Sequence, residues 1–176
     1  MRKLNVLELN RISLEEYKQC NKIPLTVVLD DVRSMYNVGS IFRTSDAFRV
    51  EGIYLCGITS TPPHPEIHKT ALGAEYSVEW KYMNSALDAV KELKEKEYRI
   101  YGIEQVEGSI MLDTDFNLGG DKVAVVLGNE VKGVQQSVID MCDGCIEIPQ
   151  FGTKHSLNVS TAAGIIIWEI WRKMKK

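Results

Sequence analysis

One short apolar run, residues 25–29 (Leu-Thr-Val-Val-Leu), constrains the fold of this chain more than any other feature. The run is almost continuous and rich in β-branched side chains, which is the pattern of a strand buried on both faces. Strands of this kind belong to parallel sheets that carry helices on both sides. The run therefore predicts a parallel sheet with residues 25–29 at its centre.

The rest of the chain alternates helical and strand patterns. Ser13 and Glu16 have the spacing of a capping box, which predicts a short helix through about Cys20, ended by Pro24. Helices are also expected over 37–48, with Asn37 near the cap, and over 66–72, 84–97, 134–141 and from 156 onward. Strands are expected over 52–56, 98–104, 122–127 and 145–148. This alternation predicts an α/β, doubly wound domain with a mostly parallel sheet over residues 25–176, preceded by a helical extension over residues 1–24.

Composition and charge indicate an ordinary globular protein. The 176 residues are 44% hydrophobic and 26% charged, without the charge excess of a disordered chain. The net charge of −3 argues against a surface coated with nucleic acid, but a local basic site needs only a few cations near the phosphates. The first ten residues lack the apolar core of a secretory signal, and the most apolar stretch, 157–168, is shorter than the about 20 residues of a membrane span. We expect a cytoplasmic protein without a membrane segment.

Cys142 and Cys145 form a CxxC pattern, which raises the question of a zinc or redox site. Neither a second CxxC nor an HxxxH pattern accompanies it, so no metal site is expected. The intervening Asp143-Gly144 pair instead predicts a tight turn between a helix and a strand.

Three polar, glycine-containing segments follow predicted strands, where open α/β sheets bind ligands. They cover residues 29–43, 127–133 and 148–160. Gly128 and Gly133 have the spacing of a phosphate loop, but Val134-Gln135 occupies the place of the required Lys-Ser/Thr pair, and no GxGxxG occurs. A nucleotide triphosphatase and a typical dinucleotide enzyme are therefore not expected. Taken singly, the polar residues of these segments also fit plain roles as helix caps or surface side chains.

Together, the three segments resemble, in order and spacing, the three motifs of the SpoU (TrmH-like) RNA ribose 2′-O-methyltransferases of the SPOUT superfamily. The matching residues, in motif order, are Asn37 and Arg43; Gly128, Asn129, Glu130 and Gly133; and Ile148, Pro149, Gly152 and the run Ser156-Leu-Asn-Val-Ser160. Residues 69–74 also look like the family, and the resemblance covers about residues 25–171. Gln150 departs from it, since the family commonly has methionine after the proline of the third motif.

The resemblance implies a C-terminal deep trefoil knot and S-adenosyl-L-methionine as the cofactor. It also implies that the cofactor contacts mostly backbone in the loops of the second and third motifs and near Glu104. The implied cofactor-binding residues are Glu104, Leu127, Gly128, Asn129, Gly133, Ile148, Pro149, Ser156, Leu157 and Asn158.

The activity implied is methyl transfer to a ribose 2′-hydroxyl, in which the family gives the motif-one arginine, here Arg43, the task of removing the proton. An arginine is a poor base because its pKa lies above about 12. We expect Arg43 to hold a substrate phosphate that assists deprotonation and to stabilise the developing oxyanion. The other residues expected to orient Arg43, the ribose or the loops are Asn37, Glu130, Ser156 and Asn158.

The expected partners are RNA and a second copy of the chain. RNA contacts are predicted for Arg33, Arg43, Lys69, Lys132 and Lys154. With about 24 residues before the first strand, no separate RNA-binding domain is expected there, which by analogy favours tRNA over ribosomal RNA. The last helix has too many apolar residues for one stripe, and family members borrow site residues between subunits, so a homodimer is expected. A ribosomal-RNA methyltransferase and a catalytically silent RNA-binding paralogue are the alternatives, and a base methyltransferase of the same superfamily is a further one.

Overall fold

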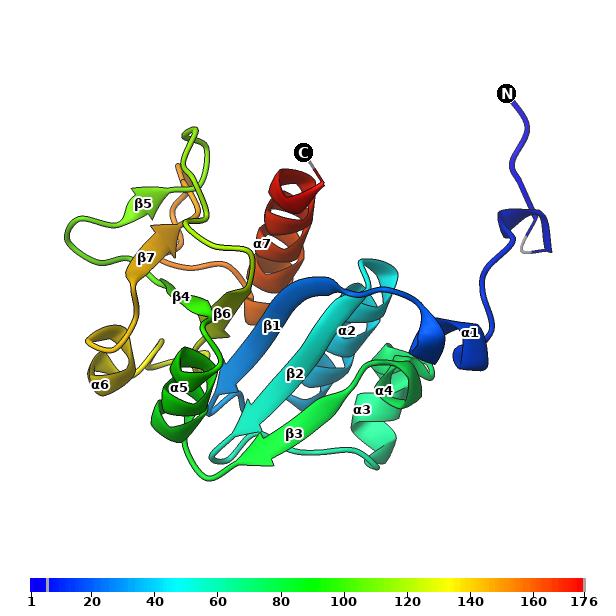
Figure 1. Cartoon of the computed structure of the whole chain (residues 1–176), viewed down its shortest axis with the longest axis horizontal. Coiled ribbons are helices and arrows are strands. Elements are labelled where there is room, and N and C mark those ends of the chain that lie inside the picture. The colour runs from blue at the N-terminus through cyan, green and yellow to red at the C-terminus, as the bar shows by residue number, and fades with distance from the viewer. Residues whose placement is uncertain (6, 176) are drawn as a thin grey trace.

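A computed structural model describes residues 1–5 and 7–175. Its seven strands form one sheet in the order β3-β2-β1-β6-β4-β7-β5 (Figure 1). All the strand pairs of this sheet are parallel. The strands are β1 (Ile23–Asp30), β2 (Val50–Cys56), β3 (Trp80–Met83), β4 (Arg99–Ile103), β5 (Ile110–Met111), β6 (Val123–Leu127) and β7 (Gly144–Glu147). The α/β class and the parallel sheet predicted from the sequence are confirmed.

The two central strands, β1 and β6, are buried on both faces. In β1, the side chains of Leu25, Val27 and Leu29 pack into one core, whereas Val28 packs into the other. The residues of β6 alternate between the same two cores. Side chains on a strand point alternately to opposite faces, so a continuous apolar run can stabilise two layers at once.

Helices cover both faces of the sheet, as a doubly wound fold requires. The core on one side includes side chains of α1 (Leu14–Gln19), α2 (Met35–Ala47), α3 (Pro65–Ala71), α4 (Ala74–Ser77) and α7 (Val159–Met174). The other core includes side chains of α5 (Ala86–Glu95) and α6 (Gln136–Ile139). Figure 1 shows α5 in front of the sheet and α2 and α7 behind it. A short 3-10 turn, η1 (Leu7–Leu9), precedes α1.

Several element ends differ from the sequence prediction. The capping box of Ser13 and Glu16 is present, but α1 ends at Gln19 and Pro24 lies inside β1. Ser34, not Asn37, caps α2, because the serine hydroxyl accepts a hydrogen bond from the Asn37 amide. Both residue types are good caps, so the pattern could not choose between them. β3, β5 and α4 were not predicted; β3 is largely exposed and therefore shows no buried pattern.

The last helix also begins later than predicted. Its cap is Asn158, whose side-chain oxygen accepts from the amides of Ser160 and Thr161. Ser156 lies before the helix and does not cap it. None of the helices in the described part of the chain is both long and apolar enough to cross a membrane.

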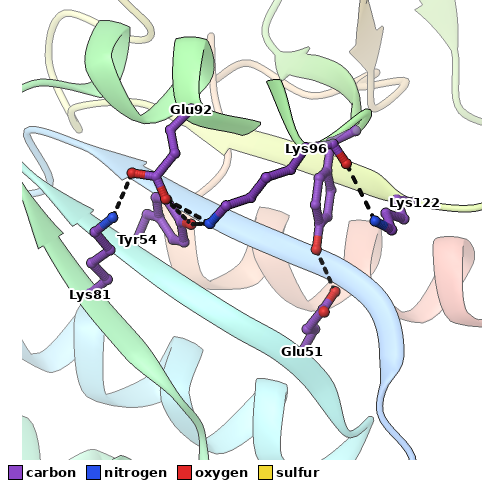
Figure 2. Close-up of polar contacts among 7 residues, drawn as sticks. Glu51, Tyr54, Lys81, Glu92, Lys96 and Lys122 are labelled. Carbon is purple, nitrogen blue, oxygen red and sulfur yellow. Dashed lines mark hydrogen bonds and ion pairs between the residues drawn. The ribbon is translucent and has the colours of Figure 1, made fainter. Parts of the chain in front are cut away.

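A charged cluster ties α5 to the sheet (Figure 2). The carboxylate of Glu92 accepts from Lys81 of β3 at 2.5 Å, from Lys96 at 2.7 Å and from the Tyr54 hydroxyl of β2 at 2.9 Å. These hydrogen bonds, first of all that from Lys81, lower the pKa of Glu92 to about 2. Glu92 thus joins the outer face of α5 to β2 and β3.

The CxxC pattern forms a turn, as predicted. Gly144 begins β7, and the Asp143 carboxylate accepts from the Ile100 amide at 2.8 Å. Cys142 donates to the Val138 carbonyl, and burial raises the pKa of its thiol to about 12. A partly buried thiol with a raised pKa is a poor nucleophile and a poor ligand.

Candidate active site

A cavity of about 640 Å³ lies beyond the carboxyl ends of β4, β6 and β7. Its volume is in the range of about 300–1,000 Å³ that is usual for small-ligand sites. Of the residues predicted to bind a cofactor, those that line the cavity are Glu104, Leu127, Gly128, Asn129, Gly133, Ile148, Ser156, Leu157 and Asn158. Pro149 is not among the lining residues. The structure therefore gathers two of the three motif segments, together with the loop after β4, around one cavity.

Sequence reasoning missed other lining residues, notably Gln105, Val106, Gln136 and His155. Gln105 and Val106 directly follow Glu104, and Gln136 begins α6. Gln105 donates to the His155 carbonyl at 3.2 Å, which links the loop after β4 to the third-motif segment. Gln105, Val106 and Gln136 carry no charged or nucleophilic group, so only their position in the fold could have indicated them.

The second-motif loop is closed by its own backbone. Asn129 and Gly133 exchange two backbone hydrogen bonds, of 3.1 and 2.8 Å. The Asn129 side chain accepts from the amides of Val131 and Lys132 and donates to the Asp31 carbonyl at 2.8 Å. This asparagine therefore holds the loop in shape and ties it to the end of β1.

The two glycines of this loop are required by its packing. A Cβ at Gly128 would lie 2.1 Å from the carbonyl carbon of Gly133, and a Cβ at Gly133 would lie 2.1 Å from a carboxylate oxygen of Glu104. Gly133 also has a φ of +67°, in the left-handed region that favours glycine. The Glu104 carboxylate accepts from the amides of Val134 at 3.1 Å and Gln105 at 3.0 Å. Contact between the two ends of the loop thus accounts for Gly128, and close packing against Glu104 accounts for Gly133.

Side chains from all three motifs form one hydrogen-bonded chain. Asn37 donates to a carboxylate oxygen of Glu130 at 3.0 Å, and Asn158 donates to the side-chain oxygen of Asn37 at 3.1 Å. The Asn158 oxygen in turn accepts from Ser160, both from its amide and from its hydroxyl. A carboxylate only accepts hydrogen bonds, so Glu130 sets the orientation of both amides.

Glu130 also anchors the start of α2. Its two carboxylate oxygens accept from the backbone amides of Arg33 at 2.9 Å and Ser34 at 3.0 Å. Burial raises the pKa of Glu130, but these amides and Asn37 outweigh it, so the net pKa is lowered. An ionised Glu130 therefore joins the second motif to the first.

Asp30 has a buried carboxylate that supports the second-motif loop and that the sequence prediction did not include. Asp30, at the end of β1, is 1% exposed and accepts from both the backbone and the side-chain amide of Gln135. Burial raises the pKa of Asp30. Asp30 and Gln135 thus fix the point at which the second-motif loop enters α6.

The residues predicted to contact RNA, Arg33, Arg43, Lys69, Lys132 and Lys154, are all exposed. Lys132 lines the cavity and the other four do not. Within residues 1–5 and 7–175, we find no hydrogen bond or ion pair made by the Arg43 side chain. The Arg43 side chain is therefore exposed on the surface of α2. It is not part of the hydrogen-bonded chain of Glu130, Asn37 and Asn158, although Asn37 belongs to the same motif.

The sheet is parallel and doubly wound, and a cavity lies at its carboxyl edge. The Glu130 carboxylate and the Asn37 and Asn158 amides link the segments beside this cavity. These features define a ligand-binding α/β domain. The chain matches the model of the SpoU rRNA Methylase family over residues 24–168 and belongs to that family. This confirms the resemblance on which the sequence interpretation depended.

Individual relatives agree with the family. A Staphylococcus haemolyticus protein assigned by name to the TrmH family of tRNA/rRNA methyltransferases is 31% identical over 160 residues, which is 91% of this chain and 63% of the relative. The chain thus spans less than two thirds of the length of that curated relative.

Solved structures show the same fold. An AdoMet-bound rRNA methyltransferase from Sinorhizobium meliloti is similar with a TM-score of 0.79 and 26% identity, covering 89% of this chain and 59% of that one. A TrmH/SpoU tRNA modifying enzyme from A. aeolicus is similar with a TM-score of 0.79 and 26% identity, covering 97% of this chain and 85% of that one. The knot implied by the family remains a prediction.

Proposed function

We propose that this chain is an S-adenosyl-L-methionine-dependent RNA methyltransferase that modifies a ribose 2′-hydroxyl, with tRNA as its favoured substrate. The observation that carries the proposal is the hydrogen-bonded chain from Glu130 through Asn37 to Asn158, which joins the three family motifs beside the cavity. Family membership and the methyltransferase names of the relatives support it.

The cavity suits the proposed cofactor. Leu127, Ile148 and Leu157 line the cavity and would offer an apolar wall to a purine ring. Glu104, Glu130 and Glu147 line the same cavity with Lys132, so acidic residues outnumber lysines there and would favour a cationic ligand. Bound S-adenosyl-L-methionine supplies a methyl group on a positively charged sulfur.

Arg43 is proposed to act on the RNA. Its guanidinium would hold a substrate phosphate in a bidentate contact and stabilise negative charge on the ribose oxygen, while that phosphate assists removal of the proton. Asn37, Glu130 and Asn158 would hold the start of α2, and with it Arg43, in place. Ser156 lines the cavity and is proposed to orient the ribose or the loop.

RNA is proposed to bind through the exposed cations Arg33, Arg43, Lys69, Lys132 and Lys154. These few side chains can neutralise local phosphates although the whole chain carries a net charge of −3. An RNA substrate of this kind favours a cytoplasmic location.

A homodimer is proposed on the basis of α7. Its buried side chains include Ile166, Ile167 and Ile170, yet Ile165 and Trp168 on the same helix remain 37% and 48% exposed. Exposed apolar side chains on a helix that already fills one core favour burial against a second copy. Light scattering should give twice the mass of the chain, and a monomeric mass would overturn this part of the proposal.

The test is a methyl-transfer assay with labelled S-adenosyl-L-methionine and separated tRNA and ribosomal-RNA fractions, followed by nucleoside analysis. A labelled 2′-O-methylnucleoside from tRNA is the expected product. The same product from ribosomal RNA would correct the substrate, a methylated base would correct the acceptor, and no transfer to either fraction would favour a silent paralogue.

A further inference from the structure

One face of α2 combines an open aromatic ring with the candidate catalytic arginine. Tyr36, Ser40 and Arg43 are spaced four and three residues apart, so they lie along one stripe of the helix. Tyr36 and Arg43 are separated by nearly two turns, or about 10 Å along the axis. Tyr36 is 45% exposed and Arg43 is also exposed, so this stripe is open to a ligand.

The neighbouring helix α3 holds the backbone of Tyr36 and places a cation beside its ring. The Thr70 hydroxyl donates to the Tyr36 carbonyl at 2.9 Å. Gly39 permits this close contact, since a Cβ there would lie 2.2 Å from the carbonyl oxygen of Ile67. The ammonium of Lys69 lies 5.9 Å from the centroid of the Tyr36 ring. The ring is therefore anchored through its backbone and accompanied by a positive charge.

Tyr36 is the immediate sequence neighbour of a residue of the proposed site. Tyr36 precedes Asn37, which is 8% exposed and bonded to both Glu130 and Asn158. Successive helical residues point about 100° apart, so one residue joins the buried hydrogen-bonded chain and its neighbour faces solvent. An exposed tyrosine in this position is not needed for the contacts that hold the three motifs together.

We propose that Tyr36 is a stacking platform for a base of the RNA substrate, with Lys69 and Arg43 contacting phosphates nearby. The inference depends on the proposed function and names a substrate-binding element for it. Aromatic side chains bind bases by stacking whatever the base, and flanking cations track the backbone. Lys69 beside the ring and Arg43 on the same stripe of α2 give this surface the positive charge that an RNA strand complements.

The experiment compares Tyr36→Ala and Tyr36→Phe with Tyr82→Ala, a matched control because Tyr82 is 47% exposed and lies on β3. The measurements are the Kd for unfractionated tRNA by filter binding, KM and kcat for methyl transfer, and the Kd for S-adenosyl-L-methionine by calorimetry. Ultraviolet crosslinking to the same tRNA, followed by trypsin and mass spectrometry, identifies the contact. Cleavage after Arg33 and Arg43 releases residues 34–43, and cleavage after Lys81 and Lys91 releases the control peptide 82–91.

The expected result is that Tyr36→Ala weakens tRNA affinity about 5- to 150-fold and raises KM accordingly. Tyr36→Phe should stay close to the unsubstituted protein, and kcat at saturating tRNA and cofactor affinity should not change. The nucleotide adduct should appear on residues 34–43 and disappear in Tyr36→Ala.

Unchanged affinity and KM in Tyr36→Ala, with methyl transfer intact, would overturn the stacking role and leave the proposed function standing. A change of oligomeric mass in that variant would place Tyr36 between copies of the chain and also overturn it. If the unsubstituted protein transfers no methyl group but still crosslinks to tRNA through residues 34–43, the proposed function fails while the stacking role is supported.

Discussion

Replacing Gly128 with alanine tests whether the second-motif loop shapes the cofactor site. The added Cβ would lie 2.1 Å from the carbonyl carbon of Gly133 and 2.2 Å from the amide nitrogen of Val134. Both are backbone atoms, which cannot rotate away as a side chain can. The loop must therefore open, and the cavity that it walls must change shape.

The energetic cost follows from the hydrogen bonds that hold the loop closed. Opening the loop breaks the two backbone hydrogen bonds between Asn129 and Gly133, each contributing about 1 kcal/mol. If the loop closes again around a ligand, the added Cβ overlaps the backbone of Gly133 and Val134 once more. Overpacking of this kind costs about 1–3 kcal/mol. A penalty of about 2 kcal/mol on the bound state corresponds to an affinity about 30-fold lower. The two lost hydrogen bonds, about 2 kcal/mol together, should also lower the melting temperature by about 4–8 °C.

Calorimetric titration with S-adenosyl-L-methionine measures this effect, and Gly164→Ala is the matched control. A Cβ at Gly164 meets nothing within 4 Å, and the residue lies inside α7. Alanine there should stabilise the helix by about 0.5–1 kcal/mol and leave cofactor affinity unchanged. If Gly128→Ala binds the cofactor as tightly as the unsubstituted protein, the argument that this loop must be closed for binding is wrong.

Three further predictions concern the arginine, the amide chain and the charged cluster. Arg43→Lys should lower methyl transfer about 100-fold, because a lysine lacks the planar fork of the guanidinium, and should leave cofactor affinity unchanged. The control is Arg49→Lys, just beyond the end of the same helix. Turnover of Arg43→Lys close to that of the control would refute the role. Asn158→Asp keeps an N-cap acceptor but removes the donor to Asn37. The melting temperature should therefore change little, while turnover drops at least about 10-fold. A large drop in melting temperature together with the drop in turnover would indicate a purely structural residue. Glu92→Gln should lower the free energy of unfolding by about 1 kcal/mol at pH 7, since its lysine partners are half exposed. The folded pKa of Glu92 is depressed to about 2, so this contribution is present above the ordinary pKa of 4.5 and is lost as pH falls toward 2. Denaturant titrations in which the difference persists at pH 2 would contradict the assignment.

The sheet could be predicted where strands are buried on both faces. The run 25–29 indicated β1 because two helical layers require apolar side chains on both of its sides. The same reasoning missed β3, whose residues are mostly exposed at the end of the sheet. Helix caps were misplaced for a related reason: Ser34 and Asn37 have the same chemistry for capping, and the choice between them depends on contacts with a distant loop.

The sequence by itself determined the family, the alternation of strands and helices, and the segments that carry polar chemistry, because these depend on local pattern and spacing. Only the tertiary structure decided which side chains act together. Glu130 reaches Asn37 across 93 positions, and Asn158 reaches the same residue across 121. Parallel strands bring their carboxyl ends to one edge of the sheet. There the Glu130 carboxylate, from a different loop, sets the orientation of the Asn37 and Asn158 amides. The role proposed for Tyr36 likewise depends on α3, which packs close enough to α2 to place Lys69 beside the tyrosine ring.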